Sequence, residues 1–158
     1  MFSMEEKNAT VSHINVRDEK HGEETVLAVD IKFKVDMPNT VLDELHHGLR
    51  ISMFGANEEQ DELFEGGHLP RLRYPTLDPI KMNLGEQPVS LTIHRVTHDI
   101  KVDGKVKKVV LECKEGGTVT AVFTVSCNPD PDVVGKLSGL LGGDHGVSLQ
   151  VVKETDNS

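Results

Sequence analysis

The amino-acid sequence predicts a mainly β fold, an antiparallel β-sandwich or partly open barrel of about seven to eight strands with one or two short helices. Two observations carry this prediction. Between Val26 and Val35 the larger apolar residues Leu27, Val29, Ile31, Phe33 and Val35 alternate with Ala28, Asp30, Lys32 and Lys34, which is the period of a strand with one buried and one solvent-exposed face. Between Val89 and Cys127 three segments rich in β-branched residues follow one another, separated by the turn sequences Asp103-Gly104 and 115–117 (EGG).

The N-terminal part is expected to contribute two strands. Residues 1–9 are polar and are expected to form a flexible arm. Residues 11–17 form the first predicted strand, with Ile14 and Val16 on one face. The charged segment 17–24 is expected to be a loop that leads into the second strand.

A short helix and an irregular segment are expected next. Asn39 or Thr40 can cap a helix that ends at Gly48, where glycine can adopt the left-handed conformation. The apolar alternation over 49–53 fits a short strand, with continued helix as the competing interpretation. From 55 to 80 the chain is irregular, and the three prolines in its second half suit edge strands rather than a central strand.

The turn at 115–117 allows the register of one hairpin to be predicted. A two-residue turn would send the apolar residues of its two strands to opposite faces. A three-residue turn pairs Cys113 with Val119 and Val109 with Phe123, so that the apolar residues share one face and the last glycine is left-handed. A one-residue slip flips every side chain, so the apolar pattern selects the three-residue turn.

The same register separates the two cysteines. Cys127 lies eight residues beyond Val119, roughly 26 Å along an extended strand, whereas a disulfide needs Cα atoms within about 7 Å. We therefore expect no bridge between Cys113 and Cys127, and a reducing compartment such as the cytoplasm.

The last third is expected to contain one helix and one strand. Asp130 is expected to cap a helix with Pro131 at its first position, and 147–151 to form the final strand. Residues 154–158 are a polar tail, so that 10–153 make up a single β-rich domain. The predicted core includes Val29, Ile31, Phe33, Leu111, Phe123 and Val125.

Length and charge narrow the function classes. The chain has 158 residues and a net charge of −9. Binding to duplex DNA needs clustered lysine and arginine, and an anionic membrane attracts basic segments, so we expect neither partner. The sequence has no apolar run long enough for a transmembrane helix, and its polar start lacks the features of a signal peptide.

Motifs for catalysis are absent from the sequence. GxSxG, GxxxxGK[ST], HExxH and paired CxxC do not occur. We therefore expect a protein that is not an enzyme and that has no cofactor. The best metal candidates are His94, His98 and Cys113, because a turn at Asp103-Gly104 would place Cys113 opposite His94. A zinc site needs three or four ligands, and no further ligand is evident, so we expect no metal.

Two surface segments are candidates for contact with a protein partner. The first is an acidic run without an intervening basic residue, formed by Glu58, Glu59, Asp61, Glu62 and Glu65. It could attract a basic partner, although such runs are more often solvated loops. The second is the basic and aromatic group Arg71, Arg73 and Tyr74, which could hold an acidic partner or form a structural edge. Self-association into a homo-oligomer stays open.

Four segments also carry a resemblance: 69–75 (LPRLRYP), 91–94 (LTIH), 112–119 (ECKEGGTV) and 127–137 (CNPDPDVVGKL). In their order and spacing the chain resembles a group of small uncharacterised proteins from tailed bacteriophages and prophages. The resemblance implies the product of an early or accessory phage gene that acts in the bacterial cytoplasm, and the group has no assigned activity. We expect a phage-derived, non-enzymatic binding protein that inhibits a host or immune factor. Two alternatives stay open, an accessory protein of phage DNA replication or recombination and a structural protein of the virion, in its tail or as decoration. It assigns no functional residues.

Overall fold

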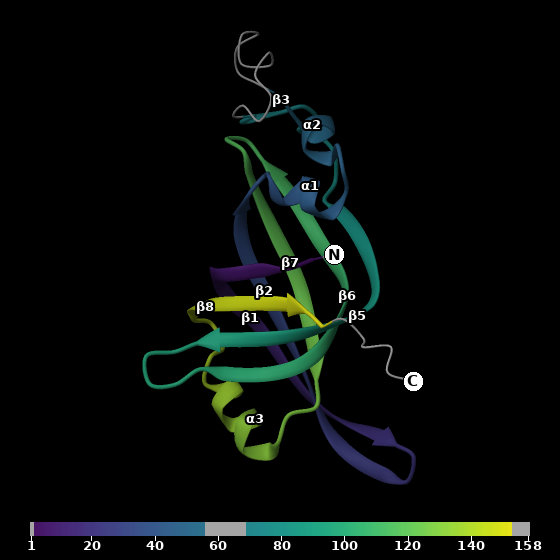
Figure 1. Ribbon diagram of the computed structural model, residues 1–158, viewed down its shortest axis with the longest axis vertical. Helices are drawn as coiled ribbons and strands as arrows, with labels where there is room; N and C mark the ends of the chain where they lie inside the picture. Colours follow the sequence, from purple (N-terminus) through teal and green to yellow (C-terminus); the bar gives the residue numbers. More distant parts are fainter. Residues whose placement is uncertain (1, 56–68, 153–158) are drawn as a thin grey trace.

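The computed structural model describes residues 2–55 and 69–152, which contain eight strands and three short helices (Figure 1). The strands are β1 (Met4–His21), β2 (Glu24–Pro38), β3 (Phe54–Gly55), β4 (Arg71–Leu72), β5 (Ile80–His94), β6 (Ile100–Lys114), β7 (Thr118–Cys127) and β8 (Asp144–Val151). The helices are α1 (Val41–Leu45), α2 (Leu49–Met53) and α3 (Pro131–Ser138). The fold is therefore mainly β, as predicted. No helix in these ranges is long and apolar enough to cross a membrane.

Six of the described strands close into a barrel in the order β1-β2-β7-β6-β5-β8, and every neighbouring pair is antiparallel. The short strands β3 and β4 form a separate sheet at one end of the molecule, beside α1 and α2 (Figure 1). The predicted sandwich or partly open barrel is thus a closed barrel. The barrel is closed by the pairing of β1, the first strand, with β8, the last. No local pattern in the sequence predicts a contact between strands so far apart in the chain.

The interior of the barrel is filled by apolar side chains from alternate positions of every strand. The six predicted core residues are all at most 2% exposed, namely Val29, Ile31, Phe33, Leu111, Phe123 and Val125. Phe123 is the centre of an aromatic cluster. Its ring stacks on Phe33 with centroids 5.4 Å apart and meets Phe2 edge to face at 4.9 Å.

The start of the chain belongs to the barrel, so the prediction of a flexible arm over 1–9 is wrong. β1 begins at Met4 and pairs with β8 as far as Thr10. Phe2 is fully buried, and its backbone N–H donates to Gln87 Oε1 at 3.1 Å, while Gln87 Nε2 donates to the Phe2 carbonyl at 2.9 Å. The segment looks like a tail in the sequence because most of its side chains face solvent.

Beyond the barrel, β1 and β2 continue as a two-stranded ribbon (Figure 1). β2 pairs with β7 only from Val29 onward, whereas its pairing with β1 extends to a tight turn at Gly22-Glu23. The predicted loop over 17–24 is therefore a hairpin. Most side chains of this ribbon are exposed on both faces, so the apolar alternation that would have marked its strands is missing.

Two turns were predicted between Val89 and Cys127. The turn at 115–117 is confirmed, and the turn at Asp103-Gly104 is wrong. Asp103-Gly104 is not a turn, because β6 runs through it and Gly104 pairs with Val89 on one side and Cys127 on the other. The connection between β5 and β6 lies instead at 95–99. An added Cβ on Gly104 would lie 2.6 Å from a backbone oxygen of β7, so this glycine allows a close approach of strands.

The second turn confirms the predicted register. Cys113 pairs with Val119 and Val109 with Phe123, and Gly117 is left-handed with φ 91°.

The helices agree in part with the prediction. α3 starts at Pro131 after the extended residue Asp130, as predicted. Residues 49–53 form the helix α2 rather than a strand, so that the described helices number three instead of one or two.

Both cysteines are free thiols, and they differ in burial. Cys127 is 4% exposed, and burial, with a smaller contribution from Asp30, raises the pKa of its thiol to about 11. Burial also raises the pKa of Cys113, which is more accessible. In the folded protein we expect iodoacetamide to label Cys127 more slowly than Cys113, because only the thiolate reacts and Cys127 is the more buried of the two.

In unfolded protein without reductant, both cysteines should label at the same rate. Mass spectrometry of the peptides reports both rates. A Cys113–Cys127 disulfide would contradict the register, and faster labelling of Cys127 in the folded protein would contradict its burial.

Candidate functional site

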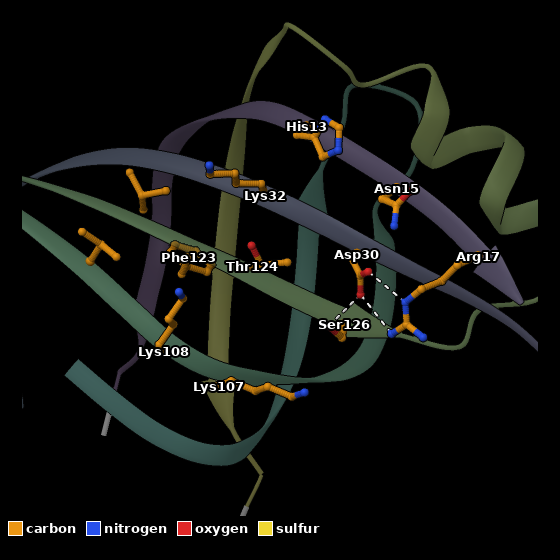
Figure 2. A pocket seen from close by; sticks show the side chains of 12 residues that line it. His13, Asn15, Arg17, Asp30, Lys32, Lys107, Lys108, Phe123, Thr124 and Ser126 are labelled. Carbon is orange, nitrogen blue, oxygen red and sulfur yellow. Dashed lines mark hydrogen bonds and ion pairs between the residues drawn. The ribbon is translucent and has the colours of Figure 1, made fainter. Parts of the chain in front are cut away.

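The outer face of β1, β2, β7 and β6 is hollowed into a groove of about 590 Å³ (Figure 2). We call it the basic groove. It is lined by His13, Asn15, Arg17, Asp30, Lys32, Lys107, Lys108, Val110, Val122, Phe123, Thr124 and Ser126. Phe123 reaches it from the core, and the other side chains are exposed or half-buried.

The middle of the basic groove is a single row across four strands. Lys32 on β2 pairs with His13 on β1 and, on its other side, with Thr124 on β7. On β6, Lys107 and Lys108 together occupy the place opposite Thr124, because the register shifts between Val106 and Val109. Successive residues of a strand normally face opposite sides, but a β-bulge re-aims one of them. Both lysines are therefore exposed on the groove face.

A second bulge lies at the other end of the row. The pairing of β1 with β2 shifts between Val11 and His13, so that Ser12 and His13 share the place opposite Lys32. Bulges bend the strand that carries them and increase its twist. The two bulges flank β2 and β7, and they account for the hollow on what would otherwise be the convex outside of a barrel.

The next row is held together by an ion pair. Arg17 Nε donates to Asp30 Oδ2 at 3.0 Å, and the hydroxyl of Ser126 donates to Asp30 Oδ1 at 2.8 Å (Figure 2). These hydrogen bonds, that of Arg17 above all, lower the pKa of the Asp30 carboxyl. Arg17 also donates to Glu19 at 2.7 Å. The Arg17 guanidinium is therefore already shared between two carboxylates.

The three lysines of the basic groove are different. Lys32, Lys107 and Lys108 make no ion pair or side-chain hydrogen bond with any part of the chain in 2–55 and 69–152. Three lysines and one arginine against one aspartate give the lining a net charge of +3 with histidine neutral, in a chain of net charge −9. The groove thus concentrates uncompensated positive charge on an acidic protein.

The predicted candidates Arg71, Arg73 and Tyr74 lie elsewhere, on the small sheet at the end of the barrel. Both guanidinium groups lie over Gly55, within 3.1–3.3 Å of where its Cβ would be. Arg73 Nε donates to the carbonyls of Ile51 and Phe54 at 2.9 Å, so this side chain holds α2 and β3 together. Tyr74 is 56% exposed. The acidic candidates Glu58, Glu59, Asp61, Glu62 and Glu65 lie outside the described residues, and their role as a partner contact stays a prediction.

The predicted metal candidates do not come together. His94 pairs with Gly146 on β8, whereas Cys113 pairs with Val119 on β7, because the turn expected at 103–104 does not exist. His98 lies in the turn between β5 and β6. Among the described residues no group of three potential ligands is close enough to hold a metal ion.

His94 takes part instead in a short chain of polar contacts. Its Nε2 lies 2.8 Å from Ser148 Oγ and its Nδ1 lies 3.5 Å from Asp99 Oδ2. The order serine, histidine, aspartate matches that of a nucleophile, its base and an orienting acid. However, Ser148 is 9% exposed, and its Oγ accepts the backbone N–H of Glu6 at 2.9 Å. A nucleophile needs access to substrate, so this chain of contacts fits a role in tying β1, β5 and β8 together.

One signal for the basic groove is present in the sequence but was not used in the prediction. Lys107 and Lys108 stand side by side between Val106 and Val109, in a segment that otherwise alternates from Lys105 to Val109. A doubled polar position within an alternating strand is the pattern of a bulge. The partners of this bulge on β1, β2 and β7 cannot be inferred without the strand order.

Comparison of the chain with protein-family models, curated proteins and solved structures gave no match.

Proposed function

We propose that this chain is a non-enzymatic binding protein whose basic groove holds an acidic segment of a partner protein. The observation that carries the proposal is the set of three lysines around Thr124 that have no side-chain partner among residues 2–55 and 69–152, on a protein of the opposite net charge. Such a cluster repels its own members unless an anion lies among them. An acidic ligand would relieve that repulsion on binding.

The chemistry of the lining suits carboxylates. Lysine ammonium groups and hydroxyls such as that of Thr124 supply donors, and the aliphatic stems of the lysines supply apolar contact. Each exposed ion pair contributes only about 0.2–1 kcal/mol, so specific binding needs several pairs at once. Three lysines in one groove supply them.

Three groups that could act in catalysis, Asp30, Cys127 and Ser148, are each held in an unreactive state by burial or hydrogen bonds. The lowered pKa of Asp30 keeps it ionised, so it cannot serve as a general acid near neutral pH. The pKa of about 11 keeps Cys127 a thiol, and Ser148 is buried. This supports a binding role over a catalytic one.

The resemblance to phage proteins leads us to propose the bacterial cytoplasm as the place of action and a host or immune factor as the partner. The second candidate is an accessory protein of phage DNA replication or recombination, which would use the same lysines along a nucleic-acid backbone. Single-stranded nucleic acid is usually held by stacking on exposed aromatic rings. The lining contains no tyrosine or tryptophan, and its one phenylalanine, Phe123, is 2% exposed, so that only the imidazole of His13 is open to stacking, and this favours the protein partner.

The test is a charge-removal variant of the basic groove. Replacing Lys32, Lys107 and Lys108 with glutamine should weaken binding of a capped peptide that alternates glycine and glutamate. Loss of three exposed ion pairs at about 0.2–1 kcal/mol each corresponds to an increase in Kd of roughly threefold to a hundredfold. Titration followed by NMR at about 0.1 M salt, where the Debye length is about 10 Å, measures this Kd.

A matched control separates the groove from net charge. Lys7, Lys20 and Lys101 are also exposed and lie outside the groove, so their replacement with glutamine changes net charge equally. We expect the control to bind within about twofold of the parent, because salt screens distant charges. Equal weakening in the two variants, or none in the groove variant, would contradict the proposal.

A further inference from the structure

The basic groove carries three kinds of chemistry in succession along β7. Three outward residues follow one another, Val122, Thr124 and Ser126. Val122 lies beside the half-buried Val110 of β6. Thr124 lies beside Lys32 and beside the adjacent residues Lys107 and Lys108, which we call the lysine bulge. Ser126 lies beside Asp30. The groove lining is therefore apolar at one end, where Val122 and Val110 lie between Lys34 and Lys81 in their row, basic in the middle and occupied by an ion pair at the other end.

The spacing of these positions is that of an extended chain. Outward residues of one strand are two positions apart, about 6.6–6.8 Å. A second extended segment lying along β7 has the same repeat. If one of its side chains lies over Val110 and Val122, the side chain two positions away lies over Lys32 and Thr124.

We propose that the basic groove recognises an extended peptide segment with an aliphatic side chain two residues from a glutamate or aspartate. This inference rests on the proposed function and adds the pattern that the groove reads. The aliphatic side chain of the peptide covers Val110 and Val122, the valine pair of the groove. The carboxylate takes the donors of Lys32, Thr124 and the lysine bulge.

The charge balance supports a short acidic segment over a nucleic acid. The lining has a net charge of +3, while the whole chain has −9. A ligand with two or three charges gains the local attraction, whereas a nucleic acid, charged at every phosphate, also extends into the negative field of the rest of the protein. The valine pair has no role in holding a phosphate backbone, but it fits an aliphatic side chain.

A double-mutant cycle between protein and peptide tests the pattern. The probe is a capped peptide of serine and glycine that carries one leucine and, two positions later, one glutamate. Its variants carry serine for leucine, glutamine for glutamate, or leucine and glutamate side by side. We expect NMR titration to move the amide signals of Lys32, Val122 and Thr124. Replacing the glutamate should raise Kd by roughly 1.5- to fivefold, as expected for one exposed ion pair, and replacing or moving the leucine should also raise Kd.

The protein variants assign each contact. Val122→Thr keeps the shape of the side chain and should remove the preference for leucine over serine, leaving the preference for glutamate. Lys32→Gln should weaken the preference for glutamate over glutamine and leave the preference for leucine, because Lys107 and Lys108 remain. Both sites are on the outer face, and unchanged amide spectra in regions remote from the groove verify that each variant is folded.

The outcomes separate this inference from the proposed function. If the spaced and adjacent peptides bind equally, or Val122→Thr leaves the leucine preference intact, the pattern is wrong while groove binding stands. If no acidic peptide moves the groove signals, both proposals fail. If an oligothymidylate moves those signals at lower concentration than the peptides do, the ligand is a nucleic acid and the peptide pattern is overturned.

Discussion

Phe123→Ala is expected to lower the free energy of unfolding by about 3–5 kcal/mol, the range for truncating a buried aromatic residue. Phe123 is 2% exposed and contacts two other rings, Phe33 at 5.4 Å and Phe2 at 4.9 Å between centroids. Its removal leaves a cavity at the point where the first residues of the chain dock into the barrel. Neighbouring side chains in a packed interior fill such a cavity only in part.

The measurement is urea denaturation of parent and variant, analysed with the same two-state slope. Tyr74→Ala is the matched control, because it removes an aromatic ring that is 56% exposed. We expect a change within about 0.5 kcal/mol there, as for most surface substitutions. A loss below about 1 kcal/mol at Phe123 would mean that it does not lie in the core.

The core could be predicted because strand periodicity is a local signal. In β2, alternate residues from Val29 to Val35 are buried as the sequence indicated, and this alternation needs no knowledge of neighbouring strands. The register at 115–117 was likewise decided within a short segment. Only one turn length brings the apolar residues of both strands to one face. Where one face of a hairpin is buried, its sequence therefore determines its register.

The site could not be predicted, because its parts are distant in the sequence. Lys32, Thr124 and the lysine bulge become neighbours only through the order β1-β2-β7-β6. That order depends on β7 pairing with β2, a contact between segments about ninety residues apart. The ribbon of β1 and β2 was missed for another reason. Both of its faces are exposed to solvent, so its sequence lacks the alternation of apolar and polar residues by which a half-buried strand is predicted.

Gly104 shows how a strong local signal can mislead. Asp-Gly is a frequent two-residue turn, because glycine adopts the left-handed conformation there. In this barrel Gly104 lies within a central strand, and the absence of a side chain serves another purpose. An added Cβ would lie 2.6 Å from Ser126 O and 2.9 Å from Val125 Cγ1. Real Cβ atoms essentially never approach so closely, so β6 and β7 would have to separate.

Gly104→Ala is therefore expected to lower the free energy of unfolding by about 1–3 kcal/mol, the usual cost of overpacking. Gly135→Ala is the control, because Gly135 lies inside α3 with no atom within 4 Å of an added Cβ. In a helix interior, alanine is favoured over glycine by about 0.5–1 kcal/mol, so this control should gain stability. Urea denaturation measures both changes.

Gly104→Asn distinguishes the close approach from a turn. Asparagine tolerates the left-handed conformation, so at a turn it would restore much of the stability that alanine loses. In a crowded strand asparagine brings the same Cβ and a larger polar side chain, and we expect it to be at least as destabilising as alanine. If Gly104→Asn is instead clearly more stable than Gly104→Ala, then Asp103-Gly104 forms a turn and the pairing of β6 with β7 at this point is wrong.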